Sequence, residues 1–268
     1  AFAKNSYKWE EEDFFVPEEV YDRFNENIVE NGQKLEEEWN QLLENYKNEY
    51  PELAEQFEQA LSNKLPEDWE EKLPAYEEDN DDIATRSVSG EVINAIAKVV
   101  PNFWGGSADL SGSNMTMIDG AEDFSAENYE GKNIWYGVRE HAMASALNGI
   151  LLHGGTKSYV ATFFVFSDYL RPAVRLAALS KIPSIYVLTH DSVAVGEDGP
   201  THEPVEHLSS YRGMPNVTMM RPADANEVAA AWKVAITSET RPTLLALTRQ
   251  NLPVLPNTDK LASEFVEK

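Results

Sequence analysis

Four segments of the sequence hold most of the residues that could do chemistry. In the first, Gly105–Asn114, two adjacent glycines allow a backbone to approach a ligand, and Ser and Asn side chains offer hydrogen bonds to an anion. The second contains Glu140 and His141, where a β-type run meets an apolar helical pattern, so the carboxylate should have a proton donor as its partner. Ordinary explanations exist for both, since Gly/Ser clusters are common in loops and the helix dipole favours a carboxylate in the first turn.

The third segment is aromatic. Phe163, Phe166 and Tyr169 are three positions apart, so one helical turn would bring their rings to one side. Rings at this spacing are often core residues. Their place after a predicted strand also fits a pocket for a planar ring.

The fourth segment, His190–His202, contains two histidines and several carboxylates after a predicted strand. Imidazole and carboxylate are common metal ligands, but histidines twelve positions apart fit none of the compact zinc spacings. We therefore expect His190, Asp198 and His202 to handle protons and to recognise hydroxyl groups of a polar substrate.

Two arginines, Arg86 and Arg221, flank apolar stretches. A guanidinium group can hold a phosphate through two parallel hydrogen bonds, although each arginine alone is also explained by a surface ion pair. The sequence contains no G-x-x-x-x-G-K-[ST], G-x-G-x-x-G, H-E-x-x-H or G-x-S-x-G motif, so these nucleotide-binding, zinc-protease and serine-hydrolase signatures are absent.

The elements between these segments must position them. Short runs rich in β-branched or aromatic residues predict strands, and stretches of helical length and period lie between them. This alternation predicts an α/β domain with a mainly parallel sheet covered by helices on both faces, which binds ligands at the carboxyl ends of its strands. The predicted strands are Ile134–Tyr136, Ser158–Phe164, Ser184–Thr189, Val217–Met220 and Thr243–Leu247. The predicted helices are Glu140–Leu152, Asp168–Ser180 and Asp224–Ser238.

Charge divides the 268-residue chain into two regions. Residues 1–82 carry 26 acidic and 7 basic side chains, and their apolar residues recur at helical spacing. Residues 83–268 carry 20 acidic and 15 basic side chains and 13 of the 14 glycines. We predict an acidic helical linker over 1–82, whose narrow apolar stripes should lie against something larger, followed by the α/β domain over 83–268.

The composition also excludes several classes of function. A formal net charge of −24 disfavours nucleic acid as a partner. The absence of cysteine rules out disulfides and thiolate sites and fits a reducing, cytoplasmic compartment. No run of about 18 apolar residues and no basic-then-apolar leader occurs, so we expect neither a membrane span nor a signal peptide.

Taken together, four motifs resemble the transketolase family. They are Gly-Ser-Ala-Asp-Leu-Ser-Gly-Ser-Asn (106–114), Gly-Val-Arg-Glu-His-Ala-Met (137–143), Gly-Glu-Asp-Gly-Pro-Thr-His-Glu-Pro-Val-Glu (196–206) and Arg-Pro-Ala-Asp-Ala-Asn-Glu (221–227). They follow the order of that family's pyrimidine-binding middle domain, and the resemblance extends from Ile83 to Leu255. Tyr7–Tyr21 also resembles the stretch that joins the diphosphate-binding domain to the middle one.

The resemblance implies thiamine diphosphate as the cofactor and a role for each matching residue. Glu140 matches the glutamate that bonds the aminopyrimidine ring nitrogen, which prepares the cofactor to take a two-carbon ketol unit from a ketose phosphate. Glu140 and His202 are thus the predicted catalytic residues. Near the cofactor the resemblance places Asp109 and the aromatic wall of Phe163, Phe166 and Tyr169. Near the substrate it places Asp198 on a hydroxyl, His202 at the reacting end of the donor, and Arg86, Ser113, His190 and Arg221 on the sugar phosphate.

The resemblance also implies what this chain does not contain. In the family a Gly-Asp-Gly…Asn motif of a separate domain holds the diphosphate and its Mg²⁺ or Ca²⁺, and neither that motif nor the C-terminal domain is recognisable here. Family active sites lie between the two subunits of a homodimer, and the substrates are sugar phosphates such as xylulose 5-phosphate and ribose 5-phosphate. We therefore expect part of a transketolase that carries half a site and is inactive by itself. The alternatives are a non-catalytic, self-associating binding module, one subunit of a split transketolase-like enzyme, and a related enzyme that uses formaldehyde or pyruvate.

Overall fold

The computed structural model describes residues 2–266, and their side chains as far as Ala262. The residues form two compact units, 1–56 and 57–268. The first unit is helical. It contains α1 (Phe2–Tyr7), α2 (Glu18–Phe24), the π-helical segment η1 (Asn25–Glu30) and α3 (Asn31–Glu49), and α4 (Pro51–Leu61) crosses the boundary along the chain.

The first unit shows why an acidic sequence still forms helices. Pro17 precedes α2, and Glu18 and Glu19 occupy its first turn, where carboxylates interact favourably with the helix dipole. On α3, Leu35 and Trp39 lie one turn apart and are 56% and 50% exposed. The predicted apolar stripe is therefore present, and it is open to solvent.

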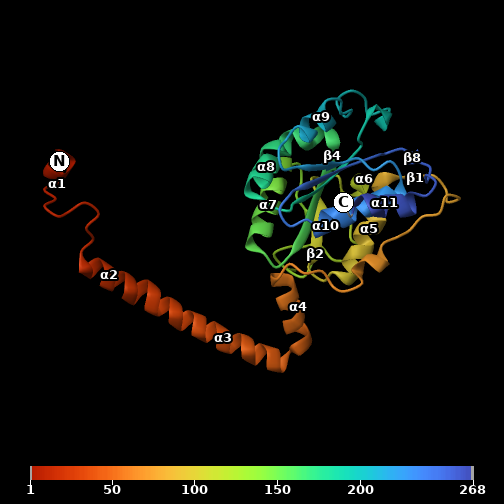
Figure 1. Cartoon of the computed structure of the whole chain (residues 1–268). Helices are drawn as coiled ribbons and strands as arrows, with labels where there is room; N and C mark the ends of the chain where they lie inside the picture. The colour runs from red at the N-terminus through yellow and green to blue at the C-terminus, as the bar shows by residue number, and fades with distance from the viewer. Residues whose placement is uncertain (1, 267–268) are drawn as a thin grey trace. The chain divides into compact units, whose positions relative to one another are not determined.

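The second unit is built on a six-stranded sheet, which confirms the predicted α/β class (Figure 1). The strand order is β3-β2-β4-β5-β7-β6, and all neighbouring strands are parallel. The strands are β2 (Phe103–Ser107), β3 (Asn133–Trp135), β4 (Lys157–Phe163), β5 (Ile185–Thr189), β6 (Thr218–Met220) and β7 (Thr243–Leu247). A separate antiparallel pair joins β1 (Ile83–Ala84) to β8 (Asn251–Leu252).

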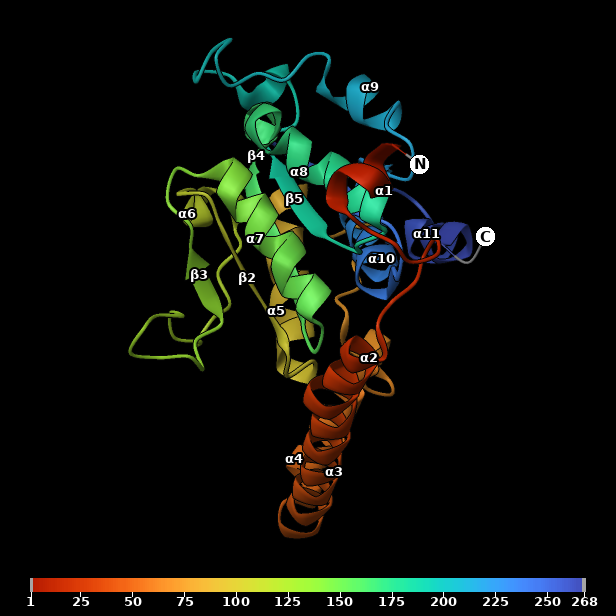
Figure 2. The same cartoon turned by 90° about the vertical axis from the view of Figure 1, so that its left-hand side faces the viewer.

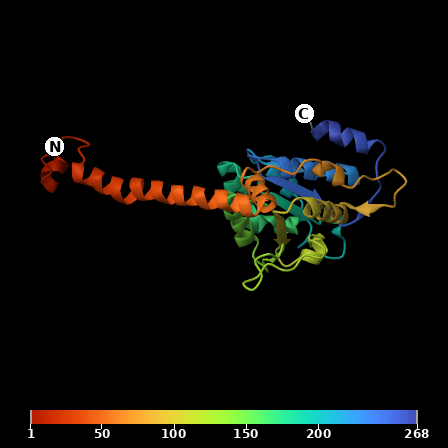
Figure 3. The same ribbon diagram turned by 90° about the horizontal axis from the view of Figure 1, so that it is seen from below.

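Helices cover both faces of this sheet. On one face lie α5 (Thr85–Val99) and α10 (Ala225–Thr237), and on the other lie α7 (Glu140–His153) and α8 (Ser167–Ser180), on the side of the sheet that is turned to the viewer in Figure 2. The layers can also be followed from below (Figure 3). The shorter helices are η2 (Trp69–Lys72), α6 (Ser111–Asn114), η3 (Phe164–Phe166), η4 (Val193–Val195), α9 (His207–Arg212) and α11 (Thr258–Val266).

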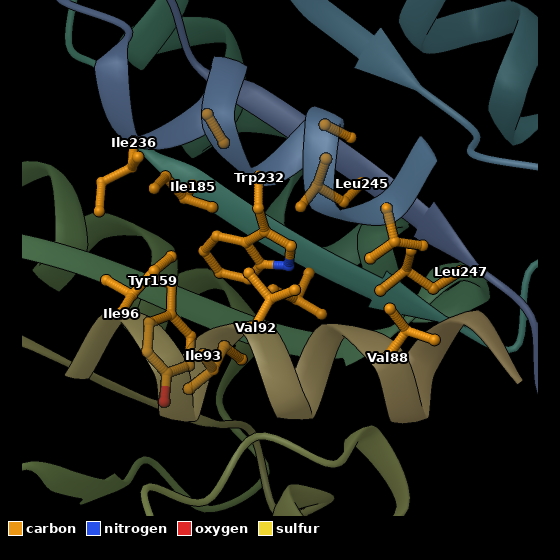
Figure 4. Packing of buried hydrophobic residues seen from close by; sticks show 14 of the residues in the cluster. Val88, Val92, Ile93, Ile96, Tyr159, Ile185, Trp232, Ile236, Leu245 and Leu247 are labelled. Carbon is orange, nitrogen blue, oxygen red and sulfur yellow. The ribbon is translucent and has the colours of Figure 1, made fainter. Parts of the chain in front are cut away.

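The two cores follow from the alternation of side chains along buried strands. Tyr159 of β4 faces the α5/α10 layer, whereas its neighbour Val160 faces α7 and α8. In the first core the indole of Trp232 points from α10 towards α5 and the sheet (Figure 4), is fully buried, and donates its Nε1–H to Ser89 Oγ at 2.8 Å. A continuous apolar layer on each face holds the strand ends in fixed positions.

Residues 57–82 belong to the second unit. Trp69 is 6% exposed and is part of the α5/α10 core, with Leu65, Leu73 and Tyr76 packed against it. Here the apolar residues of the acidic region lie against a larger body. The predicted domain boundary between residues 82 and 83 stays a prediction.

The predicted strands and helices of the α/β domain agree with the structure to within one or two residues, but its other elements, among them β2 and α5, were not predicted. Gly105 and Gly106 suggested a loop, whereas both lie inside β2. A Cβ atom on Gly105 would come within 2.4 Å of the Tyr159 carbonyl oxygen, and one on Gly106 within 1.9 Å of the Ile134 carbonyl oxygen. These glycines therefore allow the neighbouring strands to approach. None of the described helices combines the length and apolar character that a bilayer span requires.

Candidate active site

The ends of three neighbouring strands bring the predicted site residues to one edge of the sheet. Ser107 of β2 is paired with Ala161 of β4, and Phe163 at the end of β4 is paired with Thr189 at the end of β5. His190 directly follows β5, and Asp109 is the second residue after β2. As the topology predicts, the carboxyl ends of parallel strands gather residues that are far apart in the sequence.

Phe163 is the centre of an aromatic cluster at this edge. Its ring stacks on the His190 imidazole with centroids 3.6 Å apart, and it is nearly parallel to the Phe166 ring, at 6.0 Å and 6°. The His202 imidazole meets the Phe166 ring edge-on at 5.3 Å. Tyr169 adds a third ring 6.3 Å from Phe166 and is 63% exposed. The 3₁₀ turn η3, followed at once by α8, brings these residues to one side.

Glu140 is the first residue of α7 and is 9% exposed. The segment before it is fixed to the sheet, since the Tyr136 N–H donates to the Ser107 carbonyl oxygen at 3.3 Å. The carboxylate is therefore turned away from bulk solvent at the edge that carries the aromatic cluster. Within the described part of the chain, no hydrogen bond or ring contact joins Glu140 to that cluster.

The hydrogen-bond network fixes the tautomer of His190. Thr189 Oγ1 donates to Asn114 Oδ1 at 2.6 Å, so its only hydrogen is used. Thr189 Oγ1 then accepts from His190 Nδ1–H at 2.8 Å, which leaves Nε2 as an acceptor facing Arg86 Nη1 at 3.4 Å. His190 has a left-handed backbone with φ +58°, a conformation that costs about 1 kcal/mol and is common at functional sites.

Arg86 makes a cationic corner beside His190, although the Asp198 carboxylate also acts on this ring. Burial, and then the charge of Arg86, lower the pKa of His190 to about 4, so this imidazole is neutral at physiological pH. Burial, and then the nearby Arg249, lower the pKa of Arg86. Arg86 Nη1 donates to the Ser113 carbonyl oxygen at 2.7 Å, but its buried Nε has no hydrogen-bond partner among the residues that the structure describes. Such a corner suits an anion.

The other predicted substrate residues are less closely gathered. Arg221 Nε contacts the buried Asp191 carboxylate at 2.6 Å, which ties the end of β6 to the end of β5. Asp198 lies in an exposed turn, and its negative charge acts on His190. The Ser113 side chain and Asp109 are exposed, and Asp109 has a positive φ of 63°. Among the described residues, hydrogen bonds and ring contacts thus join Arg86, the Ser113 carbonyl, His190, His202 and the aromatic residues, and none links Asp109, Glu140 or Arg221 directly to them.

Sequence reasoning missed the roles of four residues in this arrangement. Asn114 and Thr189 orient the His190 ring, Asp191 holds Arg221, and Arg249 adds a positive charge near Arg86. Each of the last three stands at or directly beyond the end of a buried strand. Reading every polar residue at a strand end as a candidate would have found them.

Comparison with known proteins decides the family. The model of the transketolase pyrimidine binding domain matches residues 81–254, and that of the transketolase thiamine diphosphate binding domain matches residues 1–66. This chain belongs to the transketolase family. The predicted resemblance is confirmed, and both matching domains are thiamine diphosphate domains of transketolases.

Transketolases that resemble this chain extend well beyond it. The chain is 59% identical over 267 residues to the transketolase of Geobacillus stearothermophilus, covering 99% of this chain and 40% of that protein. The transketolase of Bacillus subtilis is 58% identical over 267 residues, again covering 99% of this chain and 40% of that protein. A mutant transketolase of Pichia stipitis, solved in complex with xylulose 5-phosphate, superposes with a TM-score of 0.90 at 47% identity, covering 94% of this chain and 38% of that one. The chain matches along nearly all its length, as expected for part of a transketolase.

Proposed function

We propose that this chain supplies the pyrimidine-side half of a transketolase active site, which transfers a two-carbon ketol unit between sugar phosphates. The observation that carries the proposal is the buried Glu140 carboxylate at the strand edge where Phe163 and Phe166 present nearly parallel rings. A planar, nitrogen-containing ring fits this set, because aromatic faces can stack on it and a carboxylate can bond one of its nitrogens.

Thiamine diphosphate, when bound, supplies the carbanion chemistry of ketol transfer. Glu140 would hold a proton at the pyrimidine nitrogen in a place with little water, where a charge-assisted hydrogen bond is strong. Phe163, Phe166 and Tyr169 would exclude water from the ring, and Asp109, in the loop after β2, would lie near it. The Mg²⁺ or Ca²⁺ of the proposal belongs with the diphosphate and is assigned to no residue of this chain.

The substrate half of the proposal rests on the cationic corner. Arg86, with Ser113, His190 and Arg221, would bind the phosphate of xylulose 5-phosphate or ribose 5-phosphate, since Arg86 has a buried donor without a partner. In the tautomer that Thr189 fixes, His190 Nε2 is an acceptor, so this neutral ring would orient Arg86 or accept from a hydroxyl group, and it would not neutralise the anion. Asp198 and His202, which follow in the next loop, would contact a hydroxyl and the reacting end of the donor.

We also propose that the enzyme is a homodimer in the cytoplasm. Along α7 the exposed positions include the small residues Ala142, Ser145 and Gly149, which permit another helix to approach closely. Large apolar side chains are exposed beside them, with Leu152 at 68% and Leu179 of α8 at 77%. A surface of this kind on a soluble domain indicates a protein interface. We expect sedimentation experiments to give the mass of a dimer in solution.

The experiment for the proposed activity uses a chimaera in which this chain replaces its aligned segment of the Geobacillus stearothermophilus transketolase. We expect thiamine diphosphate-dependent release of glyceraldehyde 3-phosphate from xylulose 5-phosphate with ribose 5-phosphate as acceptor. Glu140→Gln should lower kcat at least about 100-fold, because the proton at the ring nitrogen is lost. Glu127→Gln, a change at an exposed position, is the matched control. A Glu140→Gln chimaera with full activity would refute the proposal.

The chain by itself should show no such turnover, and calorimetry should find weak binding of thiamine diphosphate with Mg²⁺. The reason is that the charged end of the cofactor has no partner in the described residues of this chain. Turnover in a preparation free of any full-length enzyme would contradict this expectation.

A further inference from the structure

Another buried histidine, His207, lies beside two carboxylates. Asp168 stands in the first turn of α8, Glu206 directly precedes α9, and His207 is the first residue of α9. One ligand atom from each of these side chains lies within 4.8 Å of the other two. We propose that Asp168, Glu206 and His207 bind a divalent transition-metal cation, with Zn²⁺ as the ion that best matches this ligand set.

The state of the His207 ring is the independent observation behind this site. The residue is 4% exposed, and neither Nδ1 nor Nε2 has a hydrogen-bond partner among the described residues. Its Nε2 lies 3.2 Å from Asp168 Oδ2, so this nitrogen points into the cluster although the two atoms form no hydrogen bond. Buried polar side-chain atoms normally have a partner, and a cation between Nε2 and the carboxylates would supply one.

The two carboxylates are free to close on an ion. The Asp168 side chain is 58% exposed and Glu206 is also exposed, so both can change rotamer at little cost. Ligands about 2.1 Å from a tetrahedral Zn²⁺ lie about 3.4 Å from one another. If the exposed carboxylates move by roughly an ångström or more, the distances between the three ligand atoms become short enough to coordinate Zn²⁺. Water would then supply the remaining ligand.

The ligand chemistry selects the kind of ion. One imidazole and two carboxylates offer nitrogen and oxygen, which Zn²⁺ and Co²⁺ accept. Mg²⁺ and Ca²⁺ prefer sites made of oxygen only, and Cu⁺ prefers sulfur. Two negative carboxylates around one dication leave the site nearly neutral, which suits a partly buried position.

Two features limit the affinity. The amino end of α8 carries a partial positive charge, which opposes a cation. In the described part of the chain His207 Nδ1 has no hydrogen-bond acceptor, so the ring is held by packing, including contact with Phe164 at 5.6 Å between centroids. We therefore expect micromolar binding.

The test is titration of the untagged chain with ZnCl₂ by isothermal calorimetry, with CoCl₂ as a spectroscopic probe. We expect one equivalent of Zn²⁺ to bind, visible d–d absorption of low-coordinate Co²⁺ that Zn²⁺ abolishes, and a higher melting temperature with Zn²⁺ because the ion binds only the folded state. Asp168→Asn, Glu206→Gln and His207→Gln should each weaken binding at least about 10-fold.

Matched variants separate this site from other histidines. His153→Gln removes an exposed histidine at the end of α7 and should leave the titration unchanged. The variants of Asp168 and Glu206 change exposed side chains, so they keep the test valid even where His207→Gln unfolds the chain. No Zn²⁺ binding to the untagged chain, binding that survives Asp168→Asn and Glu206→Gln, or binding lost with His202→Gln instead would each overturn the proposal.

Discussion

The two buried histidines of the α/β unit have opposite surroundings. His190 is 3% exposed, lies beside Arg86 and has a partner at each ring nitrogen. His207 is 4% exposed, lies beside Asp168 and has a hydrogen-bond partner at neither nitrogen within the described residues. Both rings also contact a phenylalanine, Phe163 for His190 and Phe164 for His207.

This difference shows that burial alone does not decide what a histidine can bind. Beside arginines, a neutral imidazole with its tautomer fixed by Thr189 belongs to a corner that attracts anions. Beside carboxylates, an imidazole whose Nε2 faces Asp168 belongs to a cluster that attracts cations. Substitutions that reverse or remove the charges around His190 and His207 should therefore have different effects at the two histidines.

Reversing the charge at the cationic corner should have the largest effect. In the chimaeric enzyme, Arg86→Glu should raise the KM for xylulose 5-phosphate about 100-fold, because a charge-assisted contact is replaced by repulsion. D-xylulose, which lacks the phosphate, should react with a nearly unchanged kcat/KM. Steady-state kinetics with the two ketoses measure the effect.

The control is Arg175→Glu, which makes the same change of charge at an exposed position of α8. An equal loss with D-xylulose and with xylulose 5-phosphate would mean that Arg86 supports the structure of the site and does not bind phosphate.

The strand ends show how far the sequence predicts such a site. The sequence predicts that Phe163 and Thr189 lie at or next to strand ends, because β4 and β5 are runs of buried, β-branched or aromatic residues. Since the strands of a parallel sheet end at the same edge, it also predicts that these two residues lie close together. The orientation of His190 was not predictable, because it depends on Asn114, which comes from α6, and on a left-handed backbone. Local patterns predict elements, whereas side-chain networks between distant segments arise only in the folded chain.

The same reasoning explains the error at β2. The glycines at 105 and 106 lower the strand propensity of this segment. They are nevertheless needed in β2, because Tyr159 and Ile134 approach so closely that there is no room for a side chain at either position. His207 was not singled out, because its neighbour Asp168 is 39 positions away and belongs to another helix.

The second prediction concerns stability and pH. The pKa of His190 is about 4 in the folded chain and near 6.5 in the unfolded chain. Between pH 4 and pH 6.5 the imidazole is therefore protonated in the unfolded chain but neutral in the folded one. The stability that neutral His190 contributes is thus complete above pH 6.5 and is lost as the pH falls towards 4. The stability advantage of wild type over His190→Asn should fall over this range, by about 1.4 kcal/mol for each unit between the two pKa values.

Urea denaturation at a series of pH values measures this difference. His153→Asn removes an exposed histidine and should give a curve parallel to that of the wild type. Parallel curves for wild type and His190→Asn would show that His190 titrates alike in the folded and unfolded states.

The third prediction separates burial from charge at His190. Arg86→Met keeps the long apolar stem but removes the guanidinium, so the pKa of His190 should rise. It should stay below 6.5, because burial is the first cause of the lowered pKa and Arg86 the second. NMR titration of the imidazole carbon protons measures the pKa in both proteins. A pKa that is the same in both would remove Arg86 as an electrostatic neighbour of His190.

The smallest effect is expected at the acidic cluster without metal. Asp168→Asn should change the free energy of unfolding by less than about 1 kcal/mol in the presence of a chelator, because the Asp168 side chain is 58% exposed and exposed ion pairs contribute little. With saturating Zn²⁺ the same substitution should cost clearly more, since it removes a ligand from an ion that stabilises only the folded chain. The contrast between the two conditions is what distinguishes a cation site from a surface pair. Equal effects with chelator and with Zn²⁺ would place Asp168 outside any metal site and would leave His207 a packed core residue.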